Sequence, residues 1–89
     1  MKQFTYRIQD SAGLHARPAG ALVNLAKQFS ASVRVRANGK EADAKRLLAL
    51  MSLGAVMGTE LHFTATGEDE ERAAVALESF CREQLGGKA

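Results

Sequence analysis

The sequence predicts an α+β domain with two layers, in which an antiparallel sheet carries helices on a single face. Four short segments alternate apolar with polar residues, so each predicted strand has one apolar face. Three other segments carry helix signals, and the elements follow the order β-α-β-β-α-β-α. Because strands with one apolar face are typical of antiparallel sheets, we expect the helices to cover that face.

The chain opens with a predicted strand, a turn and an amphipathic helix. The apolar positions of the strand alternate with polar ones, and they are Phe4, Tyr6 and Ile8. Residues 10–13 interrupt this alternation with turn-forming residue types. The helix that follows is predicted to end near Gln28, and its apolar positions have the spacing of one buried helix face. These positions are Ala19, Leu22, Val23 and Ala26.

A β-hairpin is predicted in the middle of the chain. The strand before the turn has apolar residues at every second position, namely Val33, Val35 and Ala37. Asn38-Gly39 is a strong hairpin signal, because both central positions of a type I′ turn need positive φ. The third strand is therefore predicted to return from this turn over residues 40–43.

The second half of the chain predicts a short helix, a strand and a longer helix. The apolar cluster of residues 47–53 suits a helix of about two turns or fewer. The fourth strand has its apolar positions at Leu61, Phe63 and Ala65. The acidic residues 68–71 favour a helix start, where the dipole stabilises negative charge. The inner stripe of this last helix is predicted to be Ala73, Leu77, Phe80 and Gln84 or Leu85. The open face of the sheet would then carry Arg7, Arg34, Arg36, His62 and Thr64.

The composition indicates one domain over residues 1–89. Hydrophobic residues make up 46% and charged residues 25%, and the net charge of +2 calls for no polyanionic partner. The lone Cys81 excludes an internal disulfide and fits a reducing cytosol. No segment has the length of a membrane span or the pattern of a signal peptide, so we expect a cytoplasmic protein. Residues 86–89 are expected to fray.

The strongest chemical candidate is His15, where the predicted turn becomes a helix. Free backbone N–H groups and the positive dipole end of a helix favour a neutral imidazole and an incoming anion, which suits a phosphoryl acceptor. Arg17 would add a charge-assisted clamp on the phosphate oxygens. A purely structural interpretation is about equally supported by the residues alone. Gly13 and Pro18 then simply turn the chain and start the helix, although His15 and Arg17 stay unexplained.

Other kinds of site find little support in the sequence. His15, His62 and Cys81 lack the spacing of metal ligands, so we predict no metal site. Residues 54–58 lack the lysine of a P-loop, so we predict neither a nucleotide cofactor nor kinase activity. Nucleic-acid binding would need aromatic rings on the open sheet face, but the pattern assigns the rings to the core, so this is the weaker alternative.

Residues 13–19, Gly-Leu-His-Ala-Arg-Pro-Ala, resemble the active-site motif of the HPr family, the histidine-containing phosphocarriers of the bacterial sugar phosphotransferase system. Residues 38–40 resemble the central hairpin of the family, residues 50–54 its second-helix segment and residues 67–70 the entry to its final helix. The resemblance covers the chain from about Phe4 to Leu85.

The resemblance implies an open-faced β-sandwich with the strand order 1-4-2-3 and the role of a carrier, not an enzyme. His15 would accept a phosphoryl group on Nδ1 from phospho-enzyme I and pass it to the IIA domains of sugar permeases. Arg17 would bind and orient that group, and no cofactor is needed. The implied partner surface combines the first two helices, and we expect a monomer without membrane insertion. Its residues are Ala16, Arg17, Gly20, Asn24, Lys27, Leu47, Leu48 and Met51.

One departure from the family concerns regulation. Many relatives have a regulatory serine, phosphorylated by HPr kinase, at the position of Arg46 in this chain. Because arginine cannot be modified in that way, we expect the carrier role without the serine switch. The alternatives that the resemblance leaves open are a paralogue in a nitrogen-regulatory phosphotransfer branch and a mainly regulatory binding module.

Overall fold

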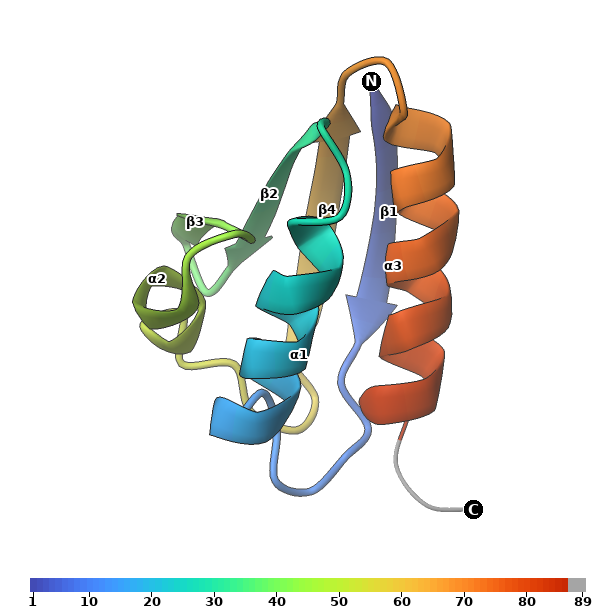
Figure 1. The fold of residues 1–89 in the computed structure, drawn as a ribbon. Helices are drawn as coiled ribbons and strands as arrows, with labels where there is room; N and C mark the ends of the chain where they lie inside the picture. The colour runs from blue at the N-terminus through green and yellow to red at the C-terminus, as the bar shows by residue number, and fades with distance from the viewer. Residues whose placement is uncertain (87–89) are drawn as a thin grey trace.

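The computed structural model describes residues 1–86 and has the predicted order of elements, shown in Figure 1. The C-terminal end, which the sequence predicts to fray, lies largely outside the described residues. The strands are β1 (Lys2–Arg7), β2 (Ser32–Ala37), β3 (Lys40–Asp43) and β4 (Glu60–Thr66). The helices are α1 (Ala16–Ala26), α2 (Leu47–Met51) and α3 (Glu70–Gln84).

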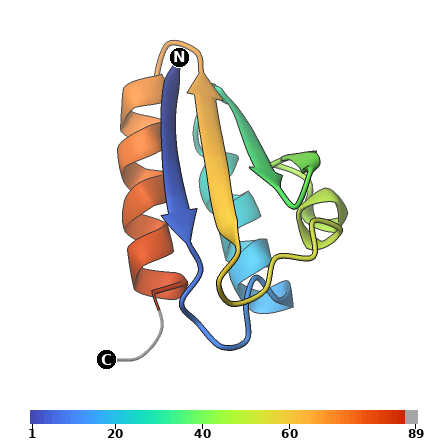
Figure 2. The same ribbon diagram turned by 180° about the vertical axis from the view of Figure 1, so that it is seen from behind.

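The four strands form one antiparallel sheet in the order β1-β4-β2-β3. This order confirms the topology that the family resemblance implies. The helices lie on one side of the sheet in Figure 1, with α2 at the β3 edge, and the opposite side is open in Figure 2. Both sequence expectations, antiparallel pairing and one covered face, are therefore confirmed, because a half-apolar sheet needs only one covering layer.

The core lies between the sheet and the helices, where the alternating residues of the strands meet the apolar stripes. Val33, Val35 and Leu61 are fully buried, whereas the arginines flanking Val35 are exposed. Phe4 and Phe63 are cross-strand partners, and their rings stack with centroids 4.7 Å apart. Within residues 1–86 no polar or charged residue is buried, so burial of apolar surface dominates the stability of the fold.

The Asn38-Gly39 turn has the predicted geometry and also a second role. Both residues have positive φ, 54° and 75°, as a type I′ turn requires. The Asn38 side-chain amide donates to the carbonyl oxygens of Leu53 and Gly54, at 3.0 and 3.2 Å. The hairpin therefore holds the segment that follows α2.

The inner stripe of α3 differs in part from the prediction. Its buried positions are Ala73, Leu77, Cys81 and, just beyond the helix, Leu85. Gln84 is exposed, so only the Leu85 alternative was right, and Phe80 is half-buried at the margin of the core. The buried positions are four residues apart, so Cys81 lies in line with Leu77 on the buried face of the helix, and Phe80, one residue earlier, lies beside that line. Burial raises the pKa of the Cys81 thiol to about 12, which makes it an inert core residue.

The acidic run before α3 does more than begin a helix. Glu70 and Glu71 occupy the first turn, as the dipole argument predicts. The Asp69 carboxylate instead accepts backbone hydrogen bonds from Ser30, at 2.9 Å, and from Ala31, at 2.8 Å. Asp69 therefore joins the start of α3 to the connection between α1 and β2.

None of the described helices could cross a membrane, since even α3 has only 15 residues.

The Asp69 contact predicts an acid-dependent component of stability. The hydrogen bond from the Ser30 N–H is the main cause that lowers the pKa of Asp69 in the folded state. The resulting stabilisation is complete above the ordinary carboxyl pKa of 3.8 and is lost as the pH falls through the folded value. Asp69→Ala should lower the Tm at pH 7 and flatten the loss of Tm below about pH 4.

Glu71→Ala is the matched control, because Glu71 lies in the same region and is exposed. Thermal unfolding followed by circular dichroism between about pH 2 and pH 7 measures both variants. Equal Tm values and parallel acid profiles for the two variants would contradict this role of Asp69.

Candidate functional site

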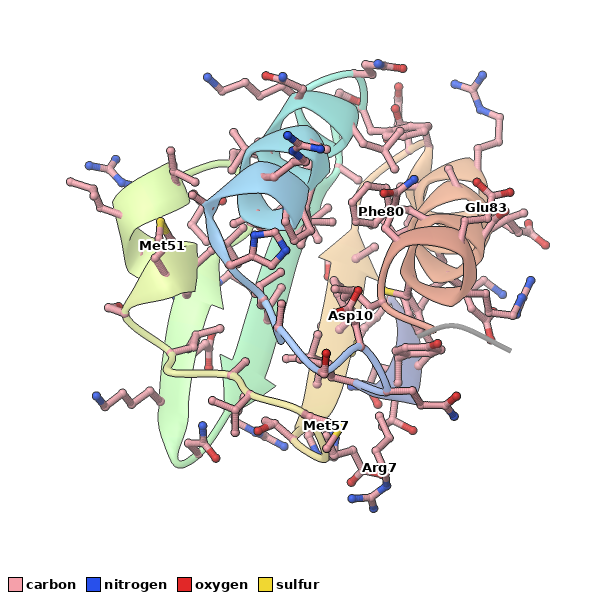
Figure 3. The ribbon with its side chains drawn as sticks, turned by 90° about the horizontal axis from the view of Figure 1, so that it is seen from below. Arg7, Asp10, Met51, Met57, Phe80 and Glu83 are labelled. Atoms are coloured by element: carbon pink, nitrogen blue, oxygen red, sulfur yellow. The ribbon has the colours of Figure 1, made fainter. Side chains whose placement is uncertain are left out.

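Two loops meet at one end of the molecule, beside the start of α1. The first is the β1–α1 loop, and the second leads from α2 to β4. Their backbones are joined by hydrogen bonds from Ile8 N–H to Thr59 O (2.9 Å), from Gly58 N–H to Ile8 O (2.8 Å) and from Leu14 N–H to Ala55 O (3.0 Å). Figure 3 shows this end, with Asp10 labelled on the first loop and Met57 on the second. The start of α1 is therefore fixed by the second loop as well as by its own chain.

Gly13 occupies the tightest point between these loops. Its φ is +68°, a conformation that favours glycine. A Cβ atom at this position would lie 2.7 Å from the Ala55 carbonyl oxygen and 2.8 Å from the Val56 Cα. Asp10 supports the turn, because its side chain accepts from Ala12 N–H at 2.8 Å and its carbonyl accepts from Gly13 N–H at 3.0 Å. The predicted turn glycine thus also permits a close backbone approach.

His15 is the N-cap residue of α1. Its backbone is extended, with φ −85° and ψ −175°, and its carbonyl accepts from Ala19 N–H at 3.0 Å. The imidazole makes no capping hydrogen bond and the residue is exposed, so the ring is available to a partner. Serine or aspartate would normally satisfy the helix end from this position.

The helix start presents unsatisfied donors next to His15. Within residues 1–86, the N–H groups of Ala16 and Arg17 have no hydrogen-bond acceptor. Pro18, the third residue of the helix, has no N–H group to satisfy. The first turn also contains no acidic side chain. Two free N–H groups and the positive helix end therefore form a site that favours an anion beside the imidazole.

Arg17 adds positive charge at the same place. Its side chain is exposed, and no carboxylate lies within ion-pair distance of it in the described part of the chain. A guanidinium without an internal partner is available for bidentate bonding to phosphate oxygens.

The two helices of the predicted partner surface pack side by side. Most of its predicted residues are exposed, and Gly20 is half-buried. The apolar cluster of residues 47–53 divides between two roles. Leu48 is 82% exposed and Leu47 and Met51 are each 40% exposed, whereas Leu50 and Leu53 are in the core. Arg46, the N-cap residue of α2, is also exposed.

Two exposed apolar residues on the loop between α2 and β4 were not predicted from the sequence. Val56 and Met57 are 62% and 57% exposed and lie on the loop that contacts Gly13 and Leu14. The signal in the sequence was this apolar pair, which lies between Gly54 and Gly58. With Leu48 on α2, they are among the large apolar side chains that remain exposed in the described residues.

The other chemical candidates lie apart from His15. His62 lies in β4, where its Nε2 is 3.3 Å from a Glu60 carboxylate oxygen. Cys81 is buried in α3. In the portion covered by the structure, no group of three or more His, Cys, Asp and Glu side chains is arranged to hold a metal ion.

Comparison with known protein families shows to which family this chain belongs. A family model described as the PTS HPr component phosphorylation site matches residues 2–83, a range that includes the whole site. The chain belongs to the HPr family. Because the match covers nearly the entire sequence, the family resemblance seen in residues 13–19 is confirmed.

Individual relatives agree with this assignment. The multiphosphoryl transfer protein of Haemophilus influenzae is 40% identical over 82 residues, which cover 89% of this chain but only 16% of that protein. The histidine-containing phosphocarrier protein of Mycoplasma has a TM-score of 0.92 at 31% identity, covering 99% of this chain and 100% of that one. A solved HPr of Thermoanaerobacter tengcongensis has a TM-score of 0.91 at 37% identity, with 100% of both chains covered. An HPr from the same organism has also been solved as a dimer, with a TM-score of 0.76 at 38% identity over 97% of this chain and 99% of that one.

The close approach at Gly13 predicts a large effect of one added methyl group. Gly13→Ala should destabilise the protein by more than about 3 kcal/mol, because it adds a backbone clash to the cost of positive φ. Gly39→Ala is the matched control, since Gly39 has φ +75° but no heavy atom within 4 Å of the place that an added methyl group would take. That variant should lose only about 1–2 kcal/mol.

Urea unfolding of both variants measures the difference in the free energy of unfolding. Equal losses would mean that the contact with residues 55–56 does not constrain Gly13.

Proposed function

We propose that His15 carries a phosphoryl group between proteins of a sugar phosphotransferase system. Phospho-enzyme I donates the group, its phosphorus–nitrogen bond breaks, and a new bond forms to Nδ1 of His15. In a second transfer, the bond between phosphorus and His15 Nδ1 breaks as a new bond forms to the IIA domain of a sugar permease. The observation that carries this proposal is the exposed imidazole at the start of α1, beside the free N–H groups of Ala16 and Arg17. Those donors stabilise charge on the phosphoryl oxygens without requiring a metal or cofactor from this chain.

Arg17 acts as the phosphoryl clamp in this proposal. Phosphoryl transfer depends mainly on in-line positioning and on stabilisation of charge. An exposed guanidinium provides both functions while still allowing the group to leave. The protein is then a stoichiometric carrier, because each molecule takes up one phosphoryl group on His15 and passes that same group on. The partner proteins supply the other groups of each reaction site.

The docking surface of this carrier is formed by α1, α2 and the adjoining loop of residues 54–59. Neither helix contains an acidic residue. Arg17 and Lys27 lie at the two ends of α1 and Arg46 caps α2, which carries the exposed Leu48. An apolar centre with a basic rim favours partners with apolar patches rimmed by carboxylates. We place the exchange in the cytoplasm. A monomer remains our prediction, because it leaves this surface free for one partner at a time.

The carrier role is favoured over the regulatory alternatives by two features. The free donors beside His15 suit a transferred group, and Arg46 offers no hydroxyl where many relatives have their regulatory serine. A nitrogen-regulatory branch would use the same chemistry at His15 with other partners.

Intact-mass analysis after incubation with enzyme I, Mg²⁺ and phosphoenolpyruvate tests the proposal. One acid-labile phosphoryl group should appear on the wild type and on His62→Ala, but not on His15→Ala. His15→Ala should keep its fold, because His15 is exposed. Failure of the wild type to gain mass, while an authentic carrier reacts in the same mixture, would contradict the proposal.

Rates of transfer in the same reaction test the clamp. Arg17→Ala should slow acceptance by about 10- to 100-fold without abolishing it, since hydrogen bonds to charged groups contribute roughly 1.5–3 kcal/mol. Lys27→Ala, which removes a charge from the rim but not from the helix start, is the control. Unchanged kinetics for Arg17→Ala would remove Arg17 from the mechanism.

The absence of a serine at position 46 gives a regulatory prediction. Incubation with HPr kinase and ATP should add no acid-stable phosphate to the wild type, whereas Arg46→Ser should create an acceptor. Phosphoserine formation on the wild-type chain, for example at the nearby Ser52, would show that the switch has moved instead of being lost.

A further inference from the structure

The open face of the sheet carries a polar hollow that the carrier chemistry does not use. The pairing of the strands places Thr5, His62 and Arg36 in one row across β1, β4 and β2. Gln3, Thr64 and Arg34 form the next row. These two rows line a shallow hollow of about 440 Å³. Figure 2 shows this face of the sheet with no helix in front of it.

The charges around the hollow are not balanced. Arg34 donates through Nε to a Glu41 carboxylate oxygen at 2.8 Å, and that carboxylate is the only one in the lining. His62 has its contact with Glu60, at 3.3 Å. Arg36 has no carboxylate within ion-pair distance among residues 1–86. Its direct cross-strand neighbours are His62 on β4 and Glu41 on β3, and the Glu41 carboxylate is bonded to Arg34 instead.

We propose that this hollow binds a small dianionic molecule whose charge is carried by a phosphate monoester or by two carboxylates. Arg36 is the anchor, because an unpaired guanidinium bonds such groups through two parallel N–H donors. The Thr5 and Thr64 hydroxyls and the Gln3 amide are further donors of the lining, which also contains Arg34 and His62. The volume lies within the range of about 300–1,000 Å³ that is usual for small-molecule sites.

This site is independent of phosphoryl transfer at His15. The hollow lies on the side of the sheet that the helices do not cover, whereas His15 begins a helix on the covered side. A small ligand there would leave the docking surface of α1 and α2 accessible. The chain would then respond to a soluble metabolite while it exchanges phosphoryl groups with proteins.

Titrations of ¹⁵N-labelled protein, followed by two-dimensional NMR, test the site. The probes are glycerol 3-phosphate and succinate, each compared with sodium chloride at equal ionic strength. At least one probe should give saturable shifts at the amides of Thr5, Arg36 and Thr64, with a Kd near about 1 mM. Tighter binding of glycerol 3-phosphate identifies a phosphate site, and tighter binding of succinate identifies a dicarboxylate site.

Arg36→Gln should weaken this binding about tenfold or more, because it replaces the charged guanidinium with a shorter, uncharged amide. Arg82→Gln removes the same charge from the exposed surface of α3 and should leave binding unchanged. His15→Ala should also retain the shifts on the sheet. Shifts that follow ionic strength alone, that occur only around His15, or that decrease equally in the two arginine variants would overturn the proposal.

Discussion

The end of the molecule that carries His15 depends on the close backbone approach between Gly13 and residues 55–56. A methyl group at Gly13 would meet the Ala55 carbonyl oxygen at 2.7 Å, so glycine is the residue that lets the two loops touch. The next residue, Leu14, is buried and donates to that same carbonyl oxygen. The chain is therefore held on both sides of the turn before it reaches His15. This constraint places an exposed imidazole at a helix start without using the imidazole as a cap.

The rest of the fold separates two chemically different faces. On the helix side, α1 and α2 combine exposed apolar residues with basic ones and have no acidic side chain. On the open side, arginines, threonines and His62 lie together with carboxylates that pair with some of the arginines. The apolar core between the faces contains no buried polar group in the described residues, so either face can change with little effect on the other. The proposed docking of protein partners and the proposed binding of a small ligand therefore use different faces.

The sequence predicted what depends on local spacing and missed what depends on distant contacts. The alternation around Val35 and the Asn38-Gly39 turn are local signals, and both strands of the hairpin follow from them. The hydrogen bonds of Asp69 to Ser30 join residues 39 positions apart, and no periodicity indicates them. Similarly, the exposure of Met57 follows from the packing of the loop of residues 54–59, which no local pattern in the sequence indicates. His15, the proposed acceptor, stands out from local signals alone.

The central claim is that the free N–H groups of Ala16 and Arg17 bind the phosphoryl group on His15. Two-dimensional NMR of ¹⁵N-labelled protein, before and after phosphorylation by enzyme I, tests it most directly. The amide protons of Ala16 and Arg17 should shift strongly downfield as they begin to donate to phosphate oxygens. The Leu14 amide should shift much less, because it already donates to Ala55. Unchanged Ala16 and Arg17 amides in a sample that mass analysis shows to be phosphorylated would contradict the account.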